Sequence, residues 1–280
     1  MSVVAVASVR SCGCSTVALG LAATWPPGDR RMLLVEADPA GGTLAAAAGW
    51  AAEPGLVSLA AAARHGGDPE LVFEHCQALP GGAFAVAGPA SAEQARSALG
   101  VLGPLLGRLG DLDAAVVVDC GRLDPGSPAL SVAERADRVL VAVRPRLADL
   151  HATATWLAAH PPGEGRLSLV AVGDGPYPDA EIADALGVEV AGRLPWDPAS
   201  ADALRGVPAS ARALRAAPLV RSLRSLAGRL AADLAPAPAV EPLATPAGGR
   251  VGLRRRVHAS WRAEPTPAGV NGSRPEGAAP

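Results

Sequence analysis

Residues suited to binding a phosphate group stand near the start of the chain. An apolar, strand-like run, Val3–Ser8, leads to a turn that Gly13 permits. Ser15 and Thr16 then open a helix-forming run, Val17–Ala22. In a phosphate-binding loop, the backbone N–H groups and the helix N-terminus face the phosphates, a lysine reaches the outer ones and a hydroxyl binds Mg²⁺. The order of strand, loop and helix therefore points to nucleotide chemistry.

The lysine that this chemistry needs is missing. Cys14 stands at the lysine position and Ser8 at that of the first glycine, and the 25 basic residues of the chain are all arginine. A composition biased toward Ala, Gly, Pro and Arg can remove surface lysines, whereas selection normally holds a catalytic one. Relaxed selection on nucleotide chemistry is therefore the simpler explanation of Cys14. Arg10 could restore some charge, but a guanidinium does not replace an ammonium at a tight site, and a solvent-exposed arginine is the simpler interpretation.

Four later segments agree with a nucleotide-binding loop, and they follow it in a fixed order: Met32–Thr43, Ala114–Gly121, Ala136–Pro145 and Gly192–Pro198. Together with the loop they resemble the ParA/MinD branch of P-loop ATPases. The branch has a loop K-G-G-x-G-K-[ST]-T, a segment D-x-D-P-x-G-G-x, a Walker B strand, a strand ending in V-x-x-P and a strand end G-x-h-P-x-D-P. In this alignment, Val9 replaces the additional lysine of the branch, and Arg10 and Ser11 replace its glycines. The matches cover roughly residues 2–230.

The resemblance implies ATP and Mg²⁺ as candidate cofactors. In the ATPases that this chain resembles, the residue matching Asp38 helps to place the attacking water. The residue matching Asp119 holds Mg²⁺ through its water shell, and the hydroxyl matching Ser15 ligates the metal. The alternative is that these residues are relics of ancestry, kept as caps and turns. The nucleotide-binding residues implied are Arg10, Ser11, Cys12, Gly13, Cys14, Ser15, Thr16, Pro195 and Asp197.

Residues 1–234 are expected to form one α/β domain, with strand-like runs alternating with Ala/Leu-rich helical stretches. Several runs are apolar throughout, as parallel strands buried on both faces should be. We predict a doubly wound, mostly parallel sheet of about seven strands flanked by helices, with ligands at the carboxyl ends of strands. The predicted strands are Val3–Ser8, Met32–Ala37, Phe84–Ala87, Ala114–Asp119, Arg138–Val143, Leu167–Val172 and Val188–Leu194.

Residue bounds can be predicted for three helical stretches. Ala92–Leu109 and Leu147–Ala159 are long enough to be crossover helices. The last candidate, Ala211–Leu234, is expected to break before Pro218. Its leucines recur at helical spacing and predict a buried face: Leu219, Leu223, Leu226 and Leu230.

Residues 235–280 are rich in Pro, Gly and Ala and are predicted to be a disordered tail. Within the basic segment 250–262, Leu253, Val257 and Trp261 fall on one helical face. Such a segment could lie on an anionic membrane, dock on a partner or bind nucleic acid, while a disordered charged tail is the default. No apolar run approaches the ~20 residues of a spanning helix, and no signal peptide is evident. We expect a cytoplasmic protein, with peripheral attachment at the inner face of the membrane as an option.

The cysteines Cys12, Cys14 and Cys120 would lie near one another at the end of the Walker B strand. A thiolate at a helix N-terminus has a lowered pKa, which would permit redox sensing or a soft metal. The alternative, which we favour, is that each is a small buried residue, because C-x-C is too close for a usual structural zinc pair. We predict free thiols.

The preferred function is that of a ParA/MinD-like protein with an eroded ATP site, acting as a spatial-positioning or regulatory scaffold. The resemblance implies protein partners, in partitioning, septum, pilus or secretion-system localisation. The absence of lysine at Val9 weighs against a nucleotide-sandwich dimer but not against a nucleotide-free homodimer. Whether the protein is an enzyme stays open at this point.

Two alternatives remain. One is an active Mg²⁺-dependent ATPase that uses Arg10 or a partner residue in place of the lysine. The other is a nonspecific DNA-binding partition protein, with nucleic acid held by the arginines of the last helical stretch. The net charge of −2 gives no general attraction to nucleic acid, and an ordinary charged helix face explains these residues too: Arg212, Arg215, Arg221 and Arg224.

Overall fold

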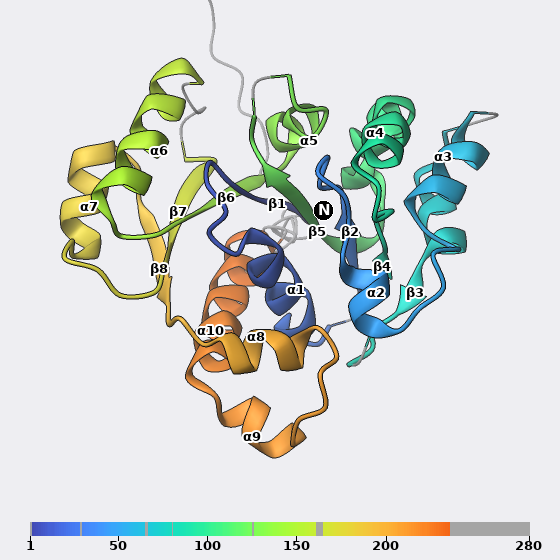
Figure 1. Cartoon of the computed structure of the whole chain (residues 1–280). Helices are drawn as coiled ribbons and strands as arrows, with labels where there is room; N and C mark the ends of the chain where they lie inside the picture. The colour runs from blue at the N-terminus through green and yellow to red at the C-terminus, as the bar shows by residue number, and fades with distance from the viewer. Residues whose placement is uncertain are drawn as a thin grey trace, which may run out of the picture. The chain divides into compact units, whose positions relative to one another are not determined.

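The computed structural model describes residues 2–28, 30–64, 67–79, 81–124, 126–160 and 165–235. Its centre is an eight-stranded sheet in the order β3-β4-β2-β5-β1-β6-β7-β8 (Figure 1). All neighbouring strands are parallel except β3 and β4. The strands are β1 (Ser2–Ser8), β2 (Arg31–Glu36), β3 (Gln77–Ala78), β4 (Phe84–Val86), β5 (Ala114–Arg122), β6 (Arg138–Val143), β7 (Leu167–Val172) and β8 (Val190–Leu194). The predicted doubly wound sheet is confirmed, with the two-residue edge strand β3 in addition.

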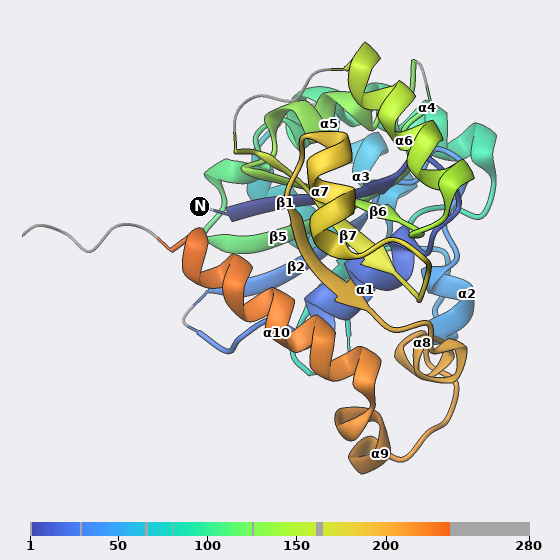
Figure 2. The ribbon, with the colours of Figure 1, turned by 90° about the vertical axis from the view of Figure 1, so that its left-hand side faces the viewer.

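Helices cover both faces of the sheet, as Figure 2 shows. One face carries α1 (Cys14–Thr24), α2 (Leu44–Ala48), α8 (Pro198–Leu204) and α10 (Pro218–Asp233), with α9 (Ala211–Ala216) packed on α10. The other face carries α3 (Leu56–Ala63), α4 (Ala92–Leu106), α5 (Leu130–Arg135), α6 (Leu147–Ala159) and α7 (Asp179–Leu186). Two short 3-10 helices, η1 (Pro69–His75) and η2 (Leu109–Asp111), complete the described elements.

Two hydrophobic cores follow from the alternation of side chains along each strand. In β1, Val4 and Val6 join the core under α1 and α10, whereas Val3 and Ala5 join the core under α3 to α7. Both cores are apolar because β1 and β5 lie in the middle of the sheet, covered on both sides. This explains why the central strands are apolar at every position.

The last helical stretch breaks before Pro218 as predicted, and α10 buries the predicted leucine face. Leu223 of α10 packs against α1 at Gly20, where an added Cβ would overlap the leucine methyls. Glycine at this position therefore lets α10 approach α1, the helix that follows the candidate phosphate loop. The close packing fixes α1 against the sheet.

The predicted tail from residue 236 onward, including the basic segment 250–262, lies outside the described residues. Among the described helices, none is long and apolar enough to cross a membrane.

Candidate functional site

The candidate loop connects β1 to α1 through a tight turn. β1 ends at Ser8, and Gly13 has a φ of +88°, a left-handed conformation that glycine adopts without strain. The first helical hydrogen bond runs from the Val17 N–H to the Gly13 carbonyl at 3.0 Å. The N–H groups of Cys14, Ser15 and Thr16 therefore have no intrahelical acceptor, and they are the groups that could face an anion.

Position 14 holds a buried, uncharged thiol. Cys14 is 7% exposed, and its Sγ donates a hydrogen bond to the Gly121 carbonyl at 3.5 Å. Burial, reinforced by the nearby Asp119 carboxylate, raises the pKa of Cys14 to about 12. The expectation of a lowered pKa at this helix N-terminus is wrong, because desolvation exceeds the effect of the helix. The residue in the lysine position thus supplies no charge of either sign.

The three cysteines do not belong to one hydrophobic core. Cys12 and Cys14 belong to the core under α1, whereas Cys120 belongs to the opposite core, because successive residues of β5 point to opposite faces. Burial also raises the pKa of Cys12 and Cys120. Over the described part of the chain, no three His, Cys, Asp or Glu side chains are grouped to hold a metal. The buried thiols fit the interpretation as small core residues.

Two acidic side chains form the wall opposite the first turn of α1. Asp119 of β5 is 3% exposed and lies beside Glu36 in the parallel register of β2 and β5. Burial raises the pKa of Asp119 to about 6, and hydrogen bonds from the Ser15 hydroxyl and the Gly121 N–H (3.0 Å) oppose this shift. The structure therefore brings together Ser15 and Asp119, the two residues predicted to serve a metal.

Glu36, which the sequence analysis did not single out, organises the segment after β2. Its Oε1 accepts from the N–H groups of Thr43 (2.8 Å) and Leu44 (3.1 Å), and its Oε2 from that of Gly88 (2.9 Å). Burial raises the pKa of Glu36, and these hydrogen bonds oppose the rise. Glu36 thus holds the start of α2 against β2. A charged residue at the end of an apolar strand was the signal for it in the sequence.

Asp38, the predicted catalytic residue, lies at the edge of this acidic wall. Its Oδ1 accepts from the Ala40 N–H at 2.7 Å. Its carboxyl lies against Gly121, where φ is +61° and an added Cβ would overlap it. Position 121, near the end of β5, therefore requires glycine, and Asp38 lies beside this end of the strand.

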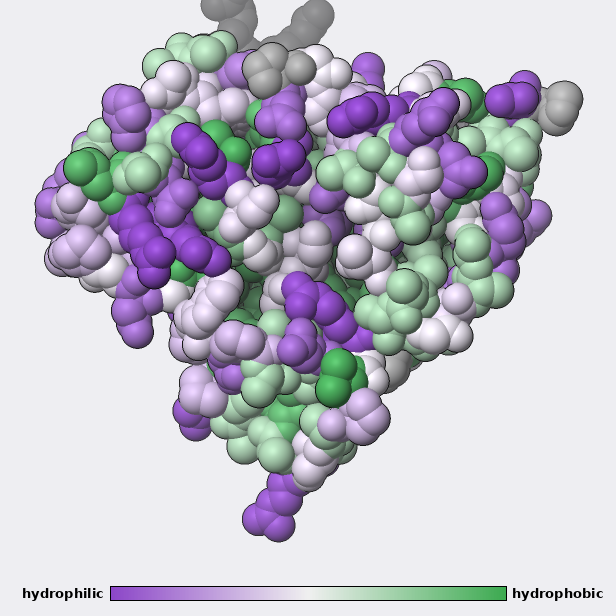
Figure 3. All heavy atoms as spheres, in the orientation of Figure 1, coloured by the Kyte–Doolittle hydropathy of each residue, from purple (hydrophilic) through white to green (hydrophobic). Residues whose placement is uncertain are grey.

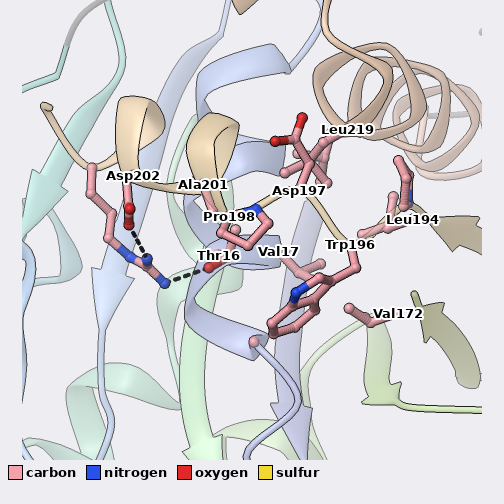
Figure 4. Close-up of a pocket in the computed structure, with 14 residues that line it drawn as sticks. Thr16, Val17, Val172, Leu194, Trp196, Asp197, Pro198, Ala201, Asp202 and Leu219 are labelled. Atoms are coloured by element: carbon pink, nitrogen blue, oxygen red, sulfur yellow. Dashed lines mark hydrogen bonds and ion pairs between the residues drawn. The ribbon is translucent and has the colours of Figure 1, made fainter. Parts of the chain in front are cut away.

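A mostly apolar cavity lies next to the same helix N-terminus (Figure 4). Thr16 and Val17 of α1 form one side, and the chain after β8, including the predicted Pro195 and Asp197, forms another. The rest of its apolar lining comes from β7, β8, α8 and α10: Val172, Leu194, Pro198, Ala201, Leu219 and Leu223.

The segment from Pro195 to Pro198 has a fixed geometry. Asp197 caps α8, because its carboxylate accepts from the Ser200 N–H (3.0 Å) and hydroxyl (2.5 Å), and these bonds lower its pKa. Trp196 is 57% exposed, and the Arg144 guanidinium lies 4.4 Å from the centre of its ring. Asp197 thus acts here as a helix cap, whereas Trp196, which sequence reasoning missed, presents an indole at the cavity.

Arg10, the candidate substitute for the missing lysine, and Arg205 lie at different places relative to two cavities. Arg10 is exposed and lines neither the cavity beside Trp196 nor the smaller one over Glu36 and Asp119. Arg205, at the end of α8, lines both, and sequence reasoning missed it.

These residues fit a magnesium nucleotide in part. The free N–H groups suit phosphate, Ser15 and Asp119 offer the oxygen ligands that Mg²⁺ prefers, and the apolar cavity could take a base. Cys14 does not fit, because it leaves the loop without its cation. Of the other predicted residues, Ser11 is exposed, Cys12 is in the core, and neither lines the cavity beside Trp196 or the one over Glu36 and Asp119.

Neither a family model nor a curated protein matches this sequence. Solved structures do match. A ParA family ATPase from Chlorobium tepidum TLS is 17% identical with a TM-score of 0.66, over 81% of this chain and 97% of that one. The chain has the fold of the ParA/MinD ATPases.

Two archaeal proteins of this fold are also similar. The cell division ATPase MinD of Pyrococcus furiosus is 19% identical with a TM-score of 0.65, over 84% of this chain and 99% of that one. The septum site-determining protein MinD of Pyrococcus horikoshii OT3, solved with Mg-ADP, is 16% identical with a TM-score of 0.63, over 82% and 95%. The structural similarity to this chain thus extends over nearly the full length of these two proteins.

Proposed function

We propose that this chain is a ParA/MinD-like protein with an eroded ATP site, which works as a spatial-positioning or regulatory scaffold. It binds a magnesium nucleotide weakly and hydrolyses it slowly or not at all. The observation that carries this proposal is the pairing of an intact strand–loop–helix geometry with a buried neutral thiol at position 14. A phosphoryl-transfer site works by positioning the reacting groups and by neutralising their charge. Without the lysine, part of that charge neutralisation is lost.

Several solved relatives support a role in positioning. They include a complex of MinC with MinD from Aquifex aeolicus and a plasmid partition protein of Borrelia burgdorferi B31 bound to AMPPNP. By analogy, this chain binds a protein partner and can pair with a second copy of itself. The face in Figure 3 shows hydrophilic and hydrophobic residues intermixed, so its hydropathy does not mark where a partner would dock.

A cytoplasmic protein of this kind is expected to show a defined position in the cell. The test is a fluorescent fusion of the full chain, expressed in its native host, as wild type and as Asp38→Ala. We expect a defined position in both, because a scaffold with an eroded site does not depend on hydrolysis. A uniform distribution of the wild type would contradict the positioning role. Loss of the position in Asp38→Ala only would favour an active ATPase instead.

A further inference from the structure

The two cavities around the first turn of α1 have an excess of negative charge. Their charged lining consists of four carboxylates and, within the described residues, a single basic side chain. The carboxylates are Glu36, Asp119, Asp197 and Asp202, and the basic side chain is Arg205. A nucleotide would bring further negative charge into this region, so any affinity for it depends strongly on the cations present.

Arg205 holds its position by contacts with two elements. One guanidinium nitrogen, Nη2, donates to the Thr16 hydroxyl at 2.6 Å, and the other, Nη1, lies 3.3 Å from the Asp202 carboxylate (Figure 4). Thr16 belongs to the first turn of α1, whose free N–H groups could face an anion. The side chain is about one-third exposed, so solvent and ligand can reach it.

The backbone of α8 fixes the position of Arg205. α8 starts at the Asp197 cap and ends at Arg205, whose N–H donates to the Ala201 carbonyl at 3.2 Å. α8 is thus seven residues long and fixed at both ends. The arginine reaches α1 across 189 positions of sequence, which is a contact that only the fold creates.

We propose that Arg205 is the cation of this phosphate site and supplies, from α8, the positive charge that Cys14 does not supply and that the exposed Arg10 does not bring into either cavity. The ligand is a magnesium-bound nucleoside polyphosphate, so the inference rests on the nucleotide binding proposed above. A planar guanidinium can donate two parallel hydrogen bonds to phosphate oxygens, which suits it to this task. To do so, Arg205 exchanges its contact with Asp202 for one with the phosphate while it remains beside Thr16.

The test is calorimetric titration of the full chain with ATP and Mg²⁺. Arg205→Ala is expected to weaken binding about tenfold or more. Hydrogen bonds to charged groups are stronger than neutral ones, and the substitution leaves the phosphate oxygens without their donor. Arg215→Ala is the matched control, because Arg215 is an exposed arginine of α9 that lines neither cavity. It should bind like the wild type. Equal affinity of Arg205→Ala and wild type would overturn the proposal.

Asp202→Asn separates a role in binding from a merely structural tie between α8 and α1. It removes the carboxylate that competes with phosphate for the guanidinium, so it should bind ATP at least as tightly as the wild type and up to a few-fold tighter. Weaker binding by Asp202→Asn would mean that Arg205 acts only by holding α8 in place. Urea unfolding of each variant checks that the fold is retained.

If the wild type binds too weakly to measure, the comparison moves to the Cys14→Lys background. There, Arg205→Ala must again weaken binding about tenfold. Equal binding with and without Arg205 would overturn the role of Arg205 and leave the nucleotide site intact. No binding in either background would overturn both the role of Arg205 and the proposed nucleotide site. The cellular position of the fusion protein tests the scaffold role separately.

Discussion

At position 14, the side chain that should carry a positive charge is a thiol buried against the Gly121 carbonyl and the Asp119 carboxylate. The sequence alone predicted the missing charge, because residue identity decides it. The favoured interpretation of Cys14 as a small buried residue agrees with its low exposure, but residue identity alone did not predict how strongly that burial raises its pKa. Glu36 and Arg205 escaped prediction because their partners are backbone N–H groups and a hydroxyl that are remote in sequence.

Asp119 should make stability depend on pH. Its pKa is about 6 in the folded chain against an ordinary 3.8, so between these values the folded state keeps a proton that the unfolded state has lost. The free energy of unfolding therefore falls as pH rises from about 4 to about 6, by up to about 3 kcal/mol, and the contribution is constant above that range. Urea titrations at several pH values, on wild type and Asp119→Asn, measure it.

The stability of Asp119→Asn should lack this decrease, so the difference between the two proteins should change across the window. Asp113→Asn removes a carboxylate that is exposed on the surface and controls for the loss of one charge. Parallel profiles for wild type and Asp119→Asn would show that Asp119 is not buried as described.

Among the elements, the central strands and α10 were predicted well. A strand that is buried on both faces is apolar at every position, and the buried face of α10 has leucines at helical spacing. β3 was missed, since two residues carry no period. β5 also continues to Arg122, beyond the predicted end at Asp119. The carboxylate therefore lies within the strand and under the first turn of α1, which accounts for its burial.

The packing of α10 on α1 should contribute much of the stability of the site. Leu223 is fully buried and packs at Gly20, so Leu223→Ala leaves a cavity between the two helices. We expect a loss of about 2–5 kcal/mol in the free energy of unfolding, measured by urea titration. Leu147→Ala, at a leucine that is 69% exposed, should change it by no more than about 0.5 kcal/mol. Similar effects of both substitutions would mean that α10 is not packed as described.

At the scale of the whole molecule, five motifs in the order of the ParA/MinD branch were enough to predict its fold, because each coincides with a strand or with a strand end of that fold. The loop, Asp38 and Asp119 meet at the carboxyl ends of neighbouring strands for this reason. Trp196 and Arg205 belong to the segment from β8 to the end of α8, which lines a cavity together with the first turn of α1 although it lies far from α1 in sequence. Only the folded structure shows that this segment reaches the loop.

The central claim is that this fold keeps a nucleotide site weakened by the loss of one cation at position 14. Calorimetric titration with ATP and Mg²⁺, on wild type and Cys14→Lys, tests it most directly. We predict weak binding by the wild type and binding at least about tenfold tighter by Cys14→Lys, because the substitution restores the charge next to the phosphates. Binding by folded Cys14→Lys that is no tighter than that of the wild type would contradict the claim.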